Sequence, residues 1–296
     1  MRRAFARCAI SPGFAVLALA QGLAGLASGI ALPAAYALAA EIAPPGRAAA
    51  ALGRVLTGWT LALVFGVTLS AVMADLLHWR ATFVLIAGAA GLLIWPTRRL
   101  PNRSGNTITL PWAALAQPGV VPGLLAQLAL MTGFYGTYSF LGAHLFGLGL
   151  EPTHGAVPVL AYGIGFGLSG RFDPWLDRRG YSGAGPRVFV AVAGALGGMA
   201  VFNDSVLALT LVFFAWGLAN HLALGLIVGR LTRVGGSRKG AVLGLNSAVT
   251  YLAVVVGAAG FAPVFAMGGL ALCAAIGATL AICLAFEARW RPVAAA

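Results

Sequence analysis

Acidic residues are scarce in this chain, which has only 7 aspartates and glutamates among its 296 residues. Charged residues of both signs make up 9% of the sequence, whereas soluble proteins carry about 25%. Cysteine is also rare, and Cys8, Cys273 and Cys283 lie far apart without any C-x-x-C pair. These shortages exclude an ordinary soluble domain, a disulfide scaffold and a cysteine metal site.

Apolar residues, in contrast, make up 60% of the sequence, and the mean hydropathy is +0.92. A helix needs about 20 apolar residues to cross the hydrocarbon of a bilayer. Nine segments reach or approach this length: 12–41, 50–76, 80–97, 119–147, 155–170, 188–202, 205–229, 240–265 and 267–286. The sequence therefore predicts an all-α, polytopic membrane protein with about nine transmembrane helices.

The basic residues lie mainly on one side of these predicted helices. Of the 19 arginines and lysines, 15 fall in alternate connections or in the C-terminal tail. The opposite connections hold only Arg80, and the N-terminal tail adds Arg2, Arg3 and Arg7. By the positive-inside rule the loaded connections, including loops at 98–118, 171–187 and 230–239, are cytoplasmic. The net charge of +12 thus reflects topology, and we expect no binding to nucleic acid.

Gly165, Gly167 and Gly170 have the order G-x-G-x-x-G, which is also the fingerprint of a dinucleotide-binding turn. That fingerprint has meaning only after a β-strand and at the start of a helix. Here it follows the apolar run VPVLAY, with no turn-bounded strand. We interpret these glycines as positions where a neighbouring membrane helix approaches closely.

An internal repeat relates the beginning of the chain to its end. Residues 47–66 align without gaps with 238–257, at an offset of 191, and the alignment pairs Arg47 with Arg238. The same offset places the first and third predicted helices on the seventh and ninth. Parallel repeats of this kind build several transporter folds. The repeat predicts an incomplete N-terminal half at 1–97, a cytoplasmic linker at 98–118 and a complete C-terminal half at 119–296.

The middle three helices have no counterparts in the first half. A complete first half would begin roughly seventy residues before Met1, so we expect three helices to be missing. A signal peptide is the alternative, because Arg2 and Arg3 precede an apolar run. We favour the repeat, because the run is too long and continues into a repeat-matched helix.

Taken together, these features resemble a bacterial major facilitator superfamily transporter of the drug and sugar efflux branch of proton antiporters. The resemblance covers nearly the whole chain, as helices 4 to 12 of the family's twelve. It rests on QGLAGLASGIALPAAYALAAEIAPPGRAAAALG at 21–53, HWRATFVLIAG at 78–88, GRFDPWLDRRG at 170–180 and RKGAVLGLNSAVTYL at 238–252.

The resemblance assigns roles to three groups of residues. The second-half copy of the family's cytoplasmic glycine-and-charge gating motif corresponds to Gly170, Asp173, Asp177, Arg178, Arg179 and Gly180. Solvated topology anchors are the alternative for this stretch. The packing glycines correspond to Gly58, Gly66 and, through the repeat, Gly257. Val67 and Thr68 replace the Gly-Pro of the antiporter motif, and Gln21 replaces a family arginine in the cavity.

The resemblance also implies a central substrate cavity, and polar residues on apolar helices are its candidates. Along 119–147 an aromatic and amide stripe shares one helical face: Gln127, Met131, Phe134, Tyr135 and Tyr138. Trp216, Asn220 and His221 lie on the helix 205–229, and Gln21 lies on the first helix. Helix packing with satisfied polar groups is the alternative.

His221 is also a candidate proton carrier, because no carboxylate occupies a predicted helix centre. It precedes Arg230 by nine residues, so it should lie about 13 Å from the cytoplasmic helix end. Imidazole titrates near neutral pH, as an antiporter requires. A packed, hydrogen-bonded histidine is the alternative.

The sequence thus predicts a multi-pass transporter in the inner membrane of a bacterium. We expect it to export a small amphipathic, drug-like or sugar-like molecule by alternating access coupled to protons. Its partners would be this substrate, protons and the lipid bilayer. A truncated, transport-inactive fragment or an accessory subunit is the alternative. No catalytic set or metal-ligand spacing is present, so we expect no enzyme activity, metal or cofactor.

Overall fold

The computed structural model describes residues 8, 13–42, 58, 62, 66–97, 111–150 and 152–290. All secondary structure within these residues is helical, which confirms the predicted all-α class. The chain divides into two compact units, one of residues 1–55 and 68–109 and the other of 56–67 and 110–296.

The described helices of the first unit are α2 (Phe14–Ile42), α4 (Val67–Leu76, whose first residue belongs to the second unit) and α5 (Trp79–Thr97). A tight turn joins α4 to α5, and Thr82 Oγ1 on α5 donates to the carbonyl of Ser70 on α4 at 3.4 Å. Leu92 and Trp95 are strongly exposed on α5, as expected for a helix that meets lipid. The predicted segments 12–41 and 80–97 match α2 and α5, whereas only the end of 50–76 lies within the described residues.

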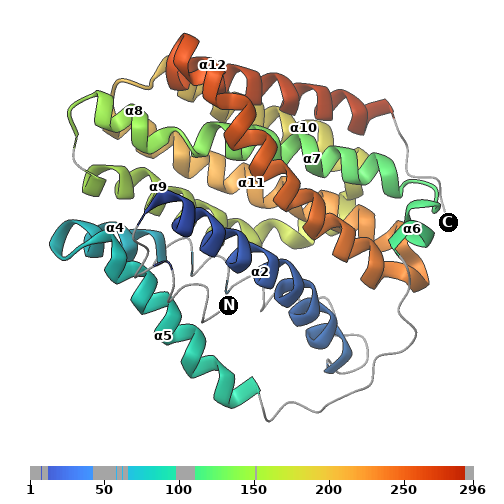
Figure 1. Ribbon diagram of the computed structural model, residues 1–296. Coiled ribbons are helices and arrows are strands. Elements are labelled where there is room, and N and C mark those ends of the chain that lie inside the picture. Colours follow the sequence, from blue (N-terminus) through green and yellow to red (C-terminus); the bar gives the residue numbers. More distant parts are fainter. Residues whose placement is uncertain are drawn as a thin grey trace. The chain divides into compact units, whose positions relative to one another are not determined.

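The second unit is a helical bundle, drawn from green to red in Figure 1. Its elements are α6 (Pro111–Leu115), α7 (Val120–Tyr138), α8 (Leu141–Gly147), α9 (Pro152–Leu168), η2 (Ser169–Phe172), α10 (Asp173–Val201), α11 (Val206–Gly235), η3 (Gly236–Arg238) and α12 (Lys239–Trp290). Helix α12 packs against α7 and α10, and α11 packs against α9 and α10. The bundle core is therefore shared by helices that are distant in sequence.

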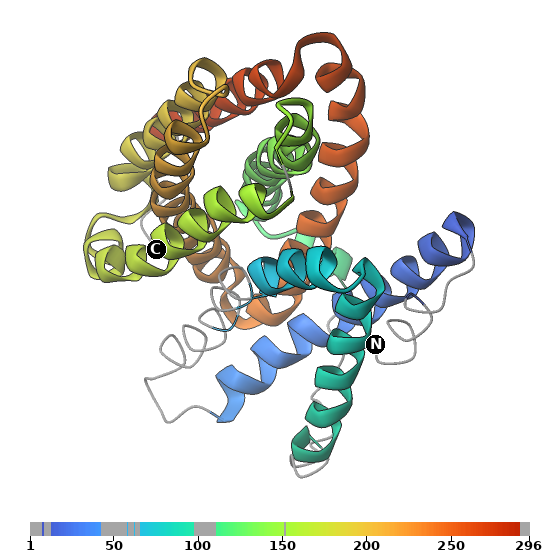
Figure 2. The ribbon, with the colours of Figure 1, turned by 90° about the vertical axis from the view of Figure 1, so that its left-hand side faces the viewer.

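Five of the described helices are long and apolar enough to cross a membrane: α5, α7 with α8, α10, α11 and α12. With 52 residues α12 is about 78 Å long, enough to cross twice. It bends sharply at Gly268 and Gly269, and Figures 1 and 2 show its two limbs running in different directions. The bend lies where the sequence predicts a break between 240–265 and 267–286.

The predicted loop 171–187 is wrong, because this stretch is helical. Helix α10 begins at Asp173 and contains a kink at Gly180, where φ is +64°. A short charged stretch, 173–179, precedes the kink, and a mostly apolar stretch, 181–201, with Arg187 as its one charged residue, follows it. Similarly, α11 continues to Gly235, five residues beyond Arg230. Charged residues form helices as readily as apolar ones, so hydropathy marks only the part of a helix that lies in lipid.

Small residues allow α9 and α11 to touch backbone to backbone. A Cβ added at Gly165 on α9 would lie 2.2 Å from the carbonyl oxygen of Phe214 on α11. A Cβ added at Gly217 on α11 would lie 2.1 Å from the carbonyl oxygen of Tyr162 on α9. These contacts have the geometry of close helix association in membranes. Of the fingerprint glycines, Gly165 is thus part of a close helix pair, whereas an added Cβ at Gly170 would meet only Asp173 Oδ2, at 3.7 Å.

Candidate functional site

An aromatic cluster lies inside the second unit, where α7, α9 and α11 meet. Phe134 is its centre, with ring centroids 4.9 Å from Trp216 and 5.5 Å from Tyr162. Tyr135 and Tyr138 border the same ring at 4.9 and 5.4 Å. Phe134, Tyr162 and Trp216 are buried, whereas the other two tyrosines are half-buried. The structure thus brings together Tyr135, Tyr138 and Trp216, three of the predicted cavity residues.

Asn220 joins this cluster through a hydrogen bond. Its Nδ2 donates to the hydroxyl of Tyr162 at 2.7 Å, and both side chains are almost completely buried. Asn220 Oδ1 and Trp216 Nε1 are also buried, but neither has a hydrogen-bond partner within the described residues. A buried polar group without a partner is costly, so these two atoms are available to a ligand or to water.

Tyr162 was missed by the sequence interpretation, which treated its helix as packing only. The signal was present in the run VPVLAYGIGFG, where a single tyrosine stands among aliphatic residues and glycines. In the cluster all described side chains are uncharged, and they offer ring faces with a few polar atoms. Such a lining suits an uncharged, amphipathic molecule.

Gln127 is separate from the aromatic cluster, although it lies on the same helix as Phe134. Its Nε2 donates to Oγ1 of Thr250 on α12 at 2.9 Å. Its Oε1 is buried without a described partner, and so is Oδ1 of Asn246, one helical turn before Thr250. Thr250, which is absent from the sequence prediction, therefore lies beside Gln127, and Asn246 lies one turn away from Thr250 on α12.

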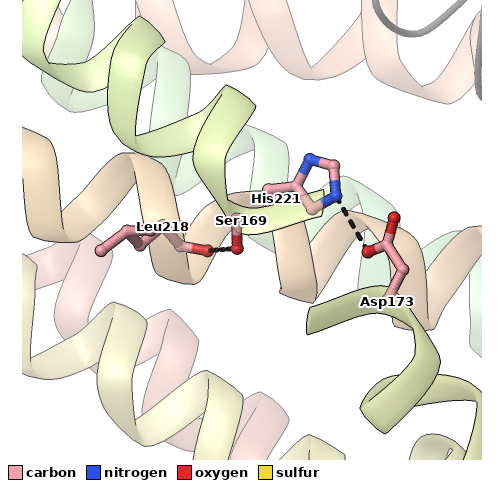
Figure 3. Close-up of polar contacts among 4 residues, drawn as sticks. All are labelled: Ser169, Asp173, Leu218 and His221. Atoms are coloured by element: carbon pink, nitrogen blue, oxygen red, sulfur yellow. Dashed lines mark hydrogen bonds and ion pairs between the residues drawn. The ribbon is translucent and has the colours of Figure 1, made fainter. Parts of the chain in front are cut away.

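His221 lies on α11 and contacts the start of α10, as Figure 3 shows. Its Nε2 is 3.1 Å from Oδ1 of Asp173, a half-exposed carboxylate. Its ring packs edge-on against Phe166, and Nδ1 is buried without a partner in the described part of the chain. Next to this pair, Ser169 Oγ donates to the carbonyl of Leu218 at 2.8 Å. The glycine-and-charge stretch is thus docked on α11 by two polar contacts.

The other predicted gating residues lie on the same short stretch. Gly170 is in η2, and Asp177 is on the first part of α10. Arg178 Nε donates to the carbonyl of Pro174 at 3.1 Å, and the guanidinium of Arg179 lies 5.4 Å from the ring of Trp175. Gly180 forms the kink, where its positive φ favours glycine.

A second ionic site lies directly after this kink, and the sequence analysis does not predict it. Arg230 on α11 donates to Glu287 on α12, and Tyr181 on α10 donates its hydroxyl to the same carboxylate. The sequence places Arg230 and Glu287 near helix ends, but their spacing does not predict that they form an ion pair.

The remaining predicted residues lie elsewhere. Gln21 is an exposed residue of α2 in the first unit. Gly257 meets the backbone of α7, because an added Cβ would lie 2.7 Å from the amide nitrogen of Gly136. An added Cβ at Gly58 or Gly66 meets no described atom within 4 Å. Among the described residues no three histidine, cysteine or acidic side chains come together as a metal site.

The family model described as Major Facilitator Superfamily matches residues 4–258 of the chain. An "Uncharacterized MFS-type transporter YwfA" of Bacillus subtilis is 30% identical over 285 residues, which cover 91% of this chain and 69% of that protein. A "Probable sugar efflux transporter" of Helicobacter acinonychis is 29% identical over 160 residues, 53% of this chain and 40% of that protein. A "Probable sugar efflux transporter" of Helicobacter pylori strain P12 is 27% identical over 190 residues, 61% of this chain and 48% of that protein. The chain thus spans about two thirds of the first relative and less than half of the two sugar efflux relatives.

Proposed function

This chain belongs to the major facilitator superfamily of membrane transporters, and from that membership we propose that it exports a small amphipathic molecule, sugar-like or drug-like, by alternating access. It is a multi-pass membrane protein and not an enzyme. We further propose the bacterial inner membrane as its location. In this proposal residues 119–296 form the C-terminal transporter half, 98–118 the cytoplasmic linker and 1–97 part of the N-terminal half.

The observation that carries the proposal is the aromatic cluster of Phe134, Tyr135, Tyr138, Tyr162 and Trp216. It is uncharged, it lies within membrane helices, and two buried polar atoms beside it have no partner in the described residues. Ring faces bind the apolar face of a sugar or an amphipathic drug, while polar atoms bind its hydroxyls or amides. The sugar efflux relatives support the sugar-like class.

Efflux assays test this function. Everted membrane vesicles that carry the chain are given a panel of radiolabelled sugars and fluorescent amphipathic dyes, with and without a proton gradient. We expect at least one compound of either class to accumulate in a gradient-dependent manner. If no compound of either class moves above the level of empty-vector vesicles, the proposal is wrong.

Trp216→Phe tests the assignment of the site. The variant keeps a ring against Phe134 but removes the indole N–H. If that N–H binds substrate, KM should rise about 5- to 20-fold, as for the loss of one buried hydrogen bond, with little change in thermal stability. Trp290→Phe is the matched control, because Trp290 is exposed near the end of α12. Equal KM values in both variants would remove Trp216 from the site.

We propose protons as the coupling ion and His221 as a titrating residue. The support is its imidazole on a membrane helix and its contact with Asp173. His221→Gln keeps a polar side chain but does not titrate. It should abolish the dependence of transport on the proton gradient while leaving exchange of substrate intact, as measured by counterflow. A packed histidine would instead leave the gradient dependence unchanged.

A further inference from the structure

Three exposed arginines gather around the kink of α10, from two helices. Arg178 and Arg179 immediately precede Gly180. Arg233, near the end of α11, places Nη1 3.9 Å from where a Cβ of Gly180 would be. By contrast, Arg230 is buried and has its own partner in Glu287. The three exposed arginines, Arg178, Arg179 and Arg233, are named the kink arginines.

The kink lies at the depth of the lipid headgroups. Residues 181–201 of α10 carry one charged side chain, the exposed Arg187, and the uncharged run 188–201 begins about 12 Å beyond Gly180 along the helix. The chain therefore leaves the hydrocarbon near Arg187, and Gly180 lies beyond it among the headgroups. This end of α10 is on the side that the arginine count assigns to the cytoplasm.

The short stretch 173–179 runs alongside α11, with Asp173 beside His221 at its start and Gly180, after its end, beside Arg233. Leu176 is buried, with its Cδ2 3.3 Å from where a Cβ of Gly225 on α11 would be. Trp175 is half-buried, and Phe172, directly before the stretch, is 53% exposed. Aromatic side chains with this exposure favour the interface between hydrocarbon and water.

The local charge is positive. Residues 171–180 contain three arginines against Asp173 and Asp177, and Arg233 adds a fourth base. Asp173 is in contact with His221. Guanidinium groups at headgroup depth are suited to a phosphate, which accepts paired hydrogen bonds from arginine.

We propose that the kink arginines bind the headgroup phosphate of an anionic phospholipid of the cytoplasmic leaflet, while Trp175 and Phe172 contact its glycerol and acyl region. The arrangement supports a lipid rather than a soluble anion, because Phe172 and Trp175 lie on the same short stretch as Arg178 and Arg179. The proposal is independent of transport, because it needs only the folded second unit in a membrane or detergent.

Lipid titration of the purified chain in detergent tests the proposal. The probes are dioctanoyl phosphatidylglycerol, dioctanoyl phosphatidylcholine and inorganic phosphate, and bound molecules are counted by native mass spectrometry. We expect the wild type to bind phosphatidylglycerol in preference to the other two. The double variant Arg179→Gln/Arg233→Gln should bind phosphatidylglycerol roughly 25-fold more weakly.

The matched control is Lys239→Gln/Arg289→Gln, which removes the same charge from exposed positions on α12. It should change the affinity for phosphatidylglycerol less than twofold. An equal loss in both double variants would show that general surface charge attracts the lipid, and would overturn the proposal. Equal binding of inorganic phosphate and phosphatidylglycerol by the wild type would overturn the lipid assignment. The unfolding temperatures of both variants in phosphatidylcholine check that each is folded.

Discussion

Arg230 and Glu287 form an ion pair between α11 and α12, with Arg230 Nη1 2.9 Å from Glu287 Oε1. The other carboxylate oxygen accepts a hydrogen bond from Tyr181 on α10, whose ring also lies 4.5 Å from the guanidinium of Arg230. Three helices are therefore joined at one carboxylate. The side chain of Arg230 is 8% exposed and that of Glu287 25%, so water only partly screens the pair.

Glu287→Gln should destabilise the second unit, because Arg230 would keep a buried charge without its partner. We expect a loss of about 2 to 4 kcal/mol, below the upper limit for buried pairs because Glu287 is partly exposed. Unfolding in detergent, followed by tryptophan fluorescence, measures the change. The double variant Arg230→Met/Glu287→Met should lose less than the sum of the two single variants. An unchanged unfolding midpoint for Glu287→Gln would contradict this account.

Gly217→Ala should disturb the contact between α9 and α11. The added methyl group would lie 2.1 Å from the carbonyl oxygen of Tyr162, so one helix must shift at a cost of roughly 1 to 3 kcal/mol. Gly229→Ala is the control on the same helix, because nothing lies within 4 Å of its added Cβ. The measurement is the unfolding midpoint of each variant. Equal midpoints would mean that the two helices do not pack as closely as described.

Asp177→Asn should impair transport more than Arg103→Gln. The resemblance places Asp177 in the glycine-and-charge motif, whereas Arg103 belongs to the predicted linker. Each variant changes the net charge by one, but in opposite directions, so expression must be matched before the two are compared. Substrate flux at matched expression decides between them. Similar flux would return the stretch 170–180 to the role of a solvated topology anchor.

Cysteine labelling checks the predicted topology. After replacement of the native cysteines, Ser104→Cys and Gly183→Cys should resist an impermeant maleimide added outside intact cells. Asp204→Cys, in the turn between α10 and α11, should react, because this turn is on the opposite side of the membrane. Efficient labelling at 104 or 183 would reverse the orientation.

Much of the fold could be predicted because long apolar runs have few alternatives. The run 119–147 corresponds to α7 and α8, 205–229 corresponds to α11 apart from Ser205, and 267–286 lies within α12, because a membrane helix must be apolar over a fixed length. The loop that the sequence predicts at 171–187 is helical in the structure, because hydropathy carries no information about helices outside lipid. Its helical form depends on Leu176 and on the kink at Gly180, which are tertiary features.

The candidate site was harder to predict, because its contacts join residues far apart in sequence. Helical spacing did place Tyr135 and Tyr138 near Phe134. It could not show that Asn220 would reach Tyr162 from another helix. Nor could it pair His221 with Asp173, 48 residues earlier. Side-chain partners of this kind depend on how the helices pack together, and the residue spacing along one helix does not determine that packing.

The bend of α12 also limits how much of the backbone is accessible on the side of the membrane opposite the arginine-rich connections. Gly269, with φ of +61°, turns the chain within two residues, so the two limbs are joined without a loop. Met267, 74% exposed, is the last side chain before the turn. Almost no backbone between these two spans is therefore accessible to a protease or an antibody. An epitope tag inserted at this bend would have to separate the two limbs of α12, which are joined directly at Gly268 and Gly269.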